Sequence, residues 1–211
     1  MGTSLYELIR SDIIAGVYRP GEPLGETALA AKYGKSRTPI REALQRLSDE
    51  RLIERTTRGV QVRVSTPEEI LDIYDVRITL EGAAARSAAL RRTDLDLVNL
   101  RRAHEAMTAY SGTTGSERAE LNRVFHEAIW IASHSPTLLD LLMRLNTHLI
   151  RYPTSTLTHG ERWERVLVEH LELLAAIENR DGDLAQRLAE GHMSGARDVR
   201  LQMYGATPDP A

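Results

Sequence analysis

The chain of 211 residues contains no cysteine, which excludes a disulfide framework and a thiolate metal site. No apolar run approaches the ~18 residues that a membrane-spanning helix needs, and the N-terminus lacks the basic and then apolar pattern of a secretory signal. No His-Glu-x-x-His motif and no phosphate-binding glycine loop occur in the sequence. We therefore expect a soluble, cytoplasmic protein that makes no use of a membrane.

The formal net charge of −3 hides an uneven distribution of charge along the chain. Residues 1–66 carry 11 Lys and Arg against 8 Asp and Glu, whereas the remaining residues carry 16 against 22. A mildly basic head on an acidic body is typical of a DNA-reading module joined to a domain with another task. We place the boundary at Ser65-Thr66-Pro67 and expect a mainly α protein with two domains, residues 1–66 and residues 67–211.

The stretch from Gly34 to Leu47 is typical of the turn and second helix of a helix-turn-helix. Gly34 can adopt the positive φ that ends a helix. Ser36 or Thr38 can cap the helix that follows, and Pro39 suits its first turn. Four apolar residues then recur at helical spacing and predict the buried face: Ile40, Ala43, Leu44 and Leu47.

A polar face runs beside this apolar stripe, because Arg37, Arg41 and Gln45 are spaced four residues apart. Arginine suits guanine edges and phosphates, and glutamine suits adenine. We expect Thr38 and Arg46 to contact phosphates. The alternative is a surface helix whose charges are merely solvated.

Residues 52–55 and 60–64 predict a small β-hairpin, since valines alternate in the second segment and Gly59 supports the turn. Helices expected over 3–15 and 26–33 precede it, which gives the order of a winged helix-turn-helix. The alternative for the hairpin tip is an ordinary basic turn. As a wing, the tip suits the DNA backbone or the minor groove and consists of Arg55, Arg58 and Gly59.

From Pro67 onward the pattern predicts helices and no strands. The expected helices run over 67–90, 93–110, 117–133, 135–152, 161–179 and 183–204. In the first of them, the expected inward stripe consists of Ile70, Ile73, Val76 and Leu80.

Three histidines on three of these helices interrupt apolar, core-facing stripes: His126, His170 and His192. A single buried histidine is more often a hydrogen-bonded core residue than a metal ligand. Three inward imidazoles each need polar partners, and a shared metal would satisfy all of them. The sequence pattern leaves both interpretations open.

With these residues in hand, the sequence resembles the GntR family of bacterial transcription regulators, and within it the FadR-like subfamily with an FCD effector domain. The head motif consists of Ser36-Arg-Thr-Pro-Ile-Arg-Glu-Ala-Leu44, Leu47, Leu52-Ile53, Arg58-Gly59 and Val62. The body motif consists of Tyr74-Asp-Val-Arg77, Leu80-Glu81, Phe125-His126, Glu169-His170 and His192. The resemblance covers nearly the whole chain. It implies a homodimer that binds a short palindrome in double-stranded DNA as a repressor or an activator and is switched by a small-molecule effector.

The resemblance also implies a divalent metal held by an acidic residue and three histidines, which here correspond to His126, His170 and His192. The acidic position is occupied by Asn122, whose neutral amide oxygen is a weaker ligand. Three alternatives follow for such a site: weaker binding of the ion, a preference for zinc or nickel, or a need for an anionic effector to complete it. The family pattern makes Arg77 the candidate that holds an effector carboxylate, although a surface arginine paired with Glu81 is the alternative.

Two residues of the head depart from the family pattern. Lys35 replaces a residue that is usually apolar, and Arg51 replaces the glycine that usually closes the recognition helix. If position 51 needs left-handed geometry, arginine there costs ~1–2 kcal/mol. Alternatively, the turn differs and Arg51 adds a phosphate contact.

A metal-dependent enzyme with an appended basic module is the competing function, because three imidazoles around a metal could activate water. However, position 130 is Trp, so the segment that begins at His126 is not a zinc-protease motif. A purely structural helical dimer would leave the Arg37, Arg41 and Gln45 face unexplained. We therefore expect a DNA-binding regulator and no enzyme activity.

Overall fold

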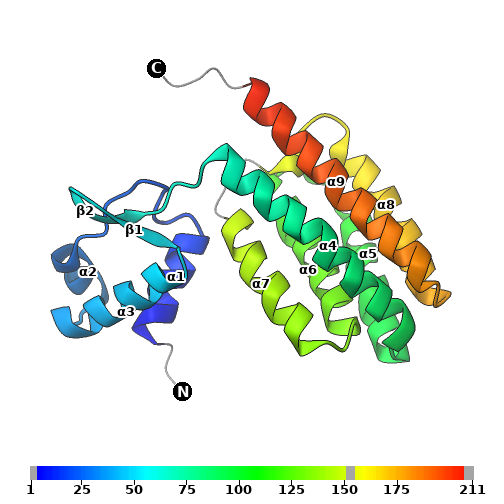
Figure 1. The fold of residues 1–211 in the computed structure, drawn as a ribbon, viewed down its shortest axis with the longest axis horizontal. Coiled ribbons are helices and arrows are strands. Elements are labelled where there is room, and N and C mark those ends of the chain that lie inside the picture. Colours follow the sequence, from blue (N-terminus) through cyan, green and yellow to red (C-terminus); the bar gives the residue numbers. More distant parts are fainter. Residues whose placement is uncertain (1–3, 151–154, 207–211) are drawn as a thin grey trace. The chain divides into compact units, whose positions relative to one another are not determined.

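The computed structural model describes residues 4–150 and 155–206, with the side chains of 148–150 and 206 excepted (Figure 1). The chain divides into two compact units, of which the first takes in residues up to Thr66 and the second begins at Pro67. The last residues of the helix Pro136–Ile150, from Thr147 onward, are grouped with the first unit. Within the described ranges no helix is long and apolar enough to cross a membrane.

The first unit is a winged helix-turn-helix, as the sequence predicts. Its elements are α1 (Leu5–Ile14), α2 (Glu26–Tyr33), α3 (Arg37–Asp49), β1 (Ile53–Thr56) and β2 (Gly59–Val62). The predicted apolar face of α3 is fully inside a separate small core that also holds Ile9 and Ile13 of α1. Leu8 of the same helix is 40% exposed.

Capping side chains and residues with positive φ mark the helix ends of the first unit. Ser4 begins α1 in a capping box with Glu7. Gly34 ends α2 with φ of 63° in the left-handed region, as expected. Ser36 occupies the cap position of α3 but makes no capping side-chain bond. Arg51 has φ of 55°, so the turn after α3 does require left-handed geometry.

The wing is an antiparallel pair in which Ile53 faces Val62 and Thr56 faces Gly59. Its turn therefore consists of Thr57 and Arg58, while Arg55 lies within β1. A short third edge was not predicted: Pro23 bridges to Gln61 of β2. The proline ring removes a donor there, which an edge position tolerates.

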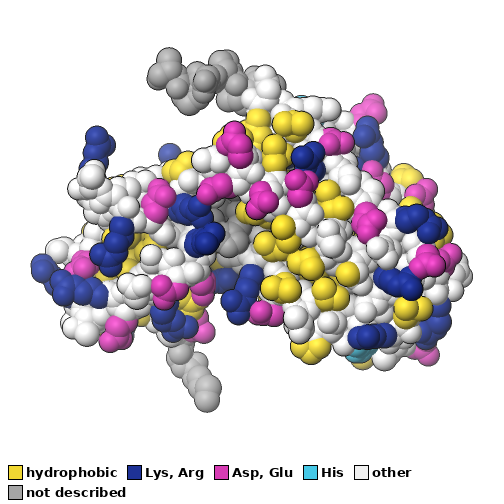
Figure 2. All heavy atoms as spheres, in the orientation of Figure 1, with side chains coloured by type: hydrophobic (Ala, Val, Ile, Leu, Met, Phe, Trp, Pro, Cys, Tyr) yellow, Lys and Arg dark blue, Asp and Glu magenta, His cyan; other side chains and the backbone are white. Residues whose placement is uncertain are grey.

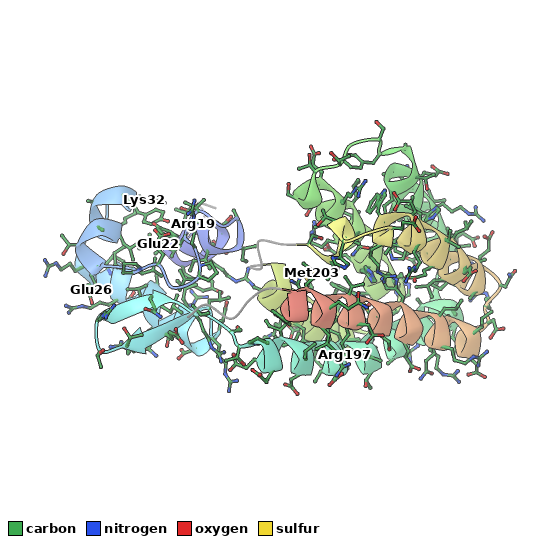
Figure 3. All side chains as sticks on the ribbon, turned by 90° about the horizontal axis from the view of Figure 1, so that it is seen from above. Arg19, Glu22, Glu26, Lys32, Arg197 and Met203 are labelled. Carbon is green, nitrogen blue, oxygen red and sulfur yellow. The ribbon has the colours of Figure 1, made fainter. Side chains whose placement is uncertain are left out.

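The second unit is an all-helical bundle. Its elements are α4 (Pro67–Arg91), α5 (Asp94–Ala109), α6 (Gly115–Ala132), α7 (Pro136–Ile150), η1 (Thr156–Thr158), α8 (Arg162–Glu178) and α9 (Gly182–Ala206). α4 and α9 lie side by side along most of their length (Figure 1). Arg197 of α9, labelled in Figure 3, pairs with Asp75 of α4 at 2.7 Å. Thr93 begins α5 through a capping box with Asp96, as its sequence position suggests.

The buried face of α4 differs from the apolar stripe that the sequence suggests. Val76 is 43% exposed, whereas Tyr74, Arg77 and Glu81 are buried. The stripe prediction is therefore wrong in this part of the helix, because the interior of the bundle here is polar. This polar interior is where the three histidines lie.

Candidate metal centre and DNA-reading face

The structure brings the three predicted histidines together from three helices. His126 comes from α6, His170 from α8 and His192 from α9, and all three are buried. His192 Nε2 lies 3.2 Å from His126 Nε2 and 3.3 Å from His170 Nε2. One ligand atom from each residue lies within 4.8 Å of the others.

These separations fit three imidazoles on one ion. Nitrogen ligands lie about 2.0–2.1 Å from zinc, so two of them that share an ion are about 2.8–3.4 Å apart at octahedral or tetrahedral angles. The two observed Nε2 separations, 3.2 and 3.3 Å, fall inside this range. Two of the three nitrogen pairs are therefore already spaced as they would be around one ion, and the third pair lies within 4.8 Å.

Hydrogen bonds alone do not satisfy the cluster. His192 Nδ1 donates to Glu169 Oε2 at 2.6 Å, so its Nε2 keeps one lone pair for two neighbouring imidazoles. The Nδ1 atoms of His126 and His170 are buried without a hydrogen-bond partner among the described residues. A metal would use all three Nε2 lone pairs at once, which hydrogen bonds among the three rings cannot do.

An ion pair between buried Arg162 and partly exposed Glu169 supports His192 at its Nδ1 atom. Arg162, at the start of α8, contacts Glu169 at 2.7 Å and donates to the backbone oxygen of His192 at 3.0 Å. Burial raises the pKa of Glu169, but the hydrogen bonds from His192 and Arg162 outweigh it, so this pKa is lowered. Such a carboxylate holds the ring and its tautomer in the form that ligates through Nε2.

A second buried ion pair lies on the side of His126. Arg77 Nη2 contacts Glu81 Oε1 at 2.5 Å, and Trp130 Nε1 donates to Glu81 Oε2 at 2.7 Å. Glu81 Oε2 is also 3.4 Å from His126 Nδ1, without hydrogen-bond geometry. Burial raises the pKa of Glu81, yet His126 and Arg77 outweigh it and hold this pKa well below its ordinary range. Arg77 is thus paired with Glu81 as the alternative supposed, but inside the bundle and not on its surface.

Burial keeps the imidazoles of His170 and His192 neutral. It lowers the pKa of His192 to about 4, even though Glu169 acts in the opposite direction. Burial also lowers the pKa of His170 well below its ordinary value, and His192, His126, His104 and Arg162 add to the effect. The ring of His170 stacks on Phe125 at 4.1 Å between centroids. Neutral imidazole is the form that binds metal.

Asn122 lies one helical turn before His126 on α6, as expected from the spacing of four residues. Its side-chain oxygen Oδ1 is buried without a hydrogen-bond partner among the described residues. A buried unsatisfied amide oxygen is costly.

The histidines outside the family pattern lie apart from the cluster or contact other groups. His104 Nε2 lies 3.1 Å from the backbone oxygen of Leu167, and His134 Nε2 lies 2.8 Å from Asp96. His159 is exposed. The side chain of His148 lies outside the described residues.

The predicted DNA-reading residues are all exposed on the first unit. They are Arg37, Thr38, Arg41, Gln45 and Arg46 of α3, with Arg58 and Gly59 at the wing. Figure 2 shows basic side chains over the part of this unit that Figure 1 labels α2, α3 and the hairpin.

Several of these side chains already have partners within the unit. Glu26 of α2, labelled in Figure 3, accepts a hydrogen bond from Arg41 Nε at 2.9 Å. Arg37 Nη2 donates to Thr27 at 3.3 Å, and the guanidinium of Arg46 lies over the Tyr6 ring at 3.8 Å. These contacts hold the side chains of the recognition helix in place. To bind DNA, each arginine must keep its present partner while it contacts the DNA, or exchange that partner for the DNA.

Three members of the buried polar network were not singled out as site residues in the sequence: Glu81, Arg162 and Glu169. Glu81 and Glu169 belong to the motif segments that resemble the family, which is a signal of their importance but not of their role. Arg162 has no sequence signal, because a charged residue at the start of a helix is usually solvated.

Comparison with known proteins agrees with the two units. Residues 2–62 match the family described as bacterial regulatory proteins, gntR family, and residues 72–195 match the FCD domain. Some members of the FCD family bind a metal.

The HTH-type transcriptional regulator YdhC of Bacillus subtilis is 30% identical over 194 residues, which are 90% of this chain and 86% of that protein. The Glc operon transcriptional activator of Escherichia coli K12 is 31% identical over 224 residues, covering 94% and 87%. The structure of E. coli McbR/YncC shares the fold with a TM-score of 0.75 at 22% identity, covering 97% of this chain and 100% of that one.

These families and relatives are transcription regulators and not enzymes, which sets aside the enzyme alternative. The chain belongs to the GntR family of bacterial DNA-binding transcription regulators, in the FadR-like subfamily that carries an FCD domain.

Proposed function

We propose that this regulator senses a small anionic metabolite at a metal held by its helical bundle and changes its affinity for a palindromic operator in response. The observation that carries the proposal is the convergence of three buried imidazole nitrogens in a domain joined to a helix-turn-helix. Its place of action is the cytoplasm, where bacterial DNA is found.

Operator recognition is assigned to the exposed polar face of α3. Arg37, Arg41 and Gln45 read base edges, while Thr38 and Arg46 contact phosphates. Arg58 and Gly59 lie at the wing, where a small turn residue permits close approach to the backbone of the DNA.

Metal binding is assigned to His126, His170 and His192 with Asn122. A bound zinc or nickel ion would supply Lewis acidity and open coordination positions for a carboxylate oxygen. Glu169 keeps the His192 ring in place through its hydrogen bond, and the burial of the cluster excludes water from competing contacts.

Arg77 is proposed to pair with the charge of the effector as well as with Glu81. A guanidinium has five N–H donors, and the contact with Glu81 involves Nη2. Arg77 Nε is buried and has no hydrogen-bond partner within the described residues. One arginine can therefore serve both carboxylates.

An effector can change DNA affinity only if it binds two arrangements of the regulator with different affinity. α4 begins at Pro67, directly after the first unit, and carries both Arg77 and Glu81. This helix is the shortest covalent route from the proposed pocket to the DNA-binding unit.

The experiment that tests this function is a gel shift with DNA from upstream of the protein's own gene. The Arg37→Ala/Arg41→Ala double variant should lose operator binding, because each base contact contributes ~1–3 kcal/mol. Arg144→Ala in α7 is the matched control, since it removes an exposed arginine of the other unit. Operator affinity and sequence preference that stay unchanged in the double variant would contradict the assignment.

A further inference from the structure

Lys35 is a residue to which the proposed function gives no role. The chain has only two lysines, Lys32 and Lys35, and both lie at the turn of the helix-turn-helix, three residues apart. The two side chains differ in their surroundings, and this difference indicates which of them is available to DNA.

Lys32 is occupied within the first unit. Its Nζ atom pairs with Asp12 at 2.9 Å and lies 4.3 Å from the centre of the Tyr18 ring. At 3.6 residues per turn, Lys32 lies on the face of α2 opposite to Glu26 and Thr27, which contact the arginines of α3 (Figure 3). The charge of Lys32 is therefore offset by a carboxylate, and its side chain is directed away from the polar face of α3.

Lys35 has the opposite surroundings. Its backbone N–H donates to the oxygen of Ala30 at 3.1 Å, which holds its backbone in the turn between α2 and α3. Its side chain is exposed and has no ion-pair or hydrogen-bond partner among the described residues. The other cationic residues from 32 to 46 each have a contact within the unit: Lys32, Arg37, Arg41 and Arg46.

The position of Lys35 relative to DNA follows from the way in which a helix-turn-helix binds. The N-terminal residues of the recognition helix enter the major groove, while the preceding helix crosses the phosphate backbone. Lys35 lies between these two helices, directly before Ser36 at the start of α3. A flexible, compact point charge at the passage from backbone to groove suits a phosphate better than a base edge.

A phosphate contact also costs Lys35 less than it costs the neighbouring arginines. Arg41 must share or exchange Glu26 when it contacts DNA, and Arg37 must share or exchange Thr27. Lys35 gives up only water. Each phosphate that a lysine neutralises releases condensed counterions from the DNA, so the contact is visible in the salt dependence of binding.

We propose that Lys35 contacts a backbone phosphate of the operator and adds affinity that does not depend on base sequence. This inference rests on the proposed binding of DNA by the polar face of α3 and extends that interface to the turn before the helix. Because a phosphate carries no sequence information, loss of Lys35 should weaken binding to any duplex by the same factor.

The test measures the DNA affinity of the full-length protein at several KCl concentrations by fluorescence anisotropy. The probes are DNA from upstream of the protein's own gene and an unrelated duplex of equal length. Lys35→Gln should reduce the slope of log K against log [KCl] by ~0.9 for each subunit on the DNA. Its ratio of affinities for the two duplexes should stay that of the wild type.

Two further variants separate the charge from other effects of substitution. Lys35→Arg keeps the charge, so it should keep the salt dependence of the wild type. Lys32→Gln removes the other lysine and should leave the slope unchanged, since the charge of Lys32 is already offset by Asp12. Thermal melting shows whether each variant is folded at the temperature of the measurement.

The scarcity of lysine allows a second measurement on the wild-type protein. Acylation by N-hydroxysuccinimide acetate, followed by peptide mass spectrometry, reports on Lys32 and Lys35 separately. DNA from upstream of the gene should protect Lys35 and leave the acylation rate of Lys32 unchanged. The hydrogen bond to Asp12 raises the pKa of Lys32, so Lys32 should be the slower of the two in the free protein.

Three outcomes would overturn the inference. An unchanged salt slope in Lys35→Gln, or equal acylation of Lys35 with and without DNA, removes the phosphate contact. A changed ratio of affinities for the two duplexes would show that Lys35 reads a base. The proposed function survives these results if the Arg37→Ala/Arg41→Ala variant loses operator binding, whereas a double variant that binds normally removes the assignment of DNA to α3.

Discussion

Arg51 holds a backbone conformation that glycine adopts more readily, with φ of 55° directly after the recognition helix. The left-handed conformation costs a residue with a Cβ ~1–2 kcal/mol, whereas glycine loses roughly 0.5–1 kcal/mol through greater freedom when unfolded. Arg51→Gly should therefore raise the free energy of unfolding by about 1 kcal/mol, measured by urea denaturation.

The matched control is Gly34→Ala, because Gly34 has φ of 63° at the end of α2 and a Cβ added there would meet open space. It should lower the free energy of unfolding by a similar amount. A loss of stability in Arg51→Gly would show that the arginine side chain contributes more than its backbone strain removes.

At the scale of elements, the sequence predicts α3 closely because its signals are local. Gly34, Pro39 and the apolar spacing define where the helix begins and which face is buried. α4 shows the limit of this approach, since its periodicity selects Val76 while the structure buries Arg77 and Glu81. Apolar patterns cannot reveal that this ion pair faces inward, because the polar groups beside it, Trp130 and His126, lie on α6, far away in sequence.

The candidate site, too, could be predicted from the sequence only in part. The three histidines could be predicted because each interrupts an apolar stripe on its own helix. The contacts of Glu169 and Arg162 with His192 could not, since they depend on how α8 packs on α9.

His170 of α8 stacks on Phe125 of α6, so this histidine is buried where the two helices pack. Burial of His170 and His192 predicts that the stability of the metal-free protein depends on pH. The pKa of His170 is lowered well below 6.5, and that of His192 to about 4. The unfolded chain therefore takes up protons as the pH falls through 6.5, while the folded chain does not. Stability should be full above pH 6.5 and fall by about 1.4 kcal/mol per pH unit for each group below it.

Urea denaturation in EDTA at pH 7 and pH 5.5 measures this effect. His170→Gln lacks one of the two groups and should show a shallower loss of stability with falling pH. An equal pH dependence in the wild type and in His170→Gln would contradict the assignment.

At the scale of the whole molecule, one recognition helix contacts few base pairs, so specific binding calls for a two-fold dimer on a palindrome. Hydrophobic side chains gather over α7 and the neighbouring part of α4 (Figure 2), and Leu141 and Val76 are each more than one-third exposed. Such a surface suits a partner subunit. Light scattering should give a dimer at micromolar concentration, and a monomer both free and on DNA would contradict this.

The central claim is that three histidines hold a divalent metal in the bundle, and metal analysis combined with thermal melting tests it most directly. Purified, untagged wild type and the exposed-histidine control His159→Ala should contain zinc or nickel, and the metal-free forms should regain a higher Tm when the ion returns. At 100 times its Kd, the ion stabilises the fold by about 2.7 kcal/mol. His126→Ala and His170→Ala should lose both the metal and the shift. A wild type that contains no metal, and whose Tm neither zinc nor nickel raises, would contradict the claim.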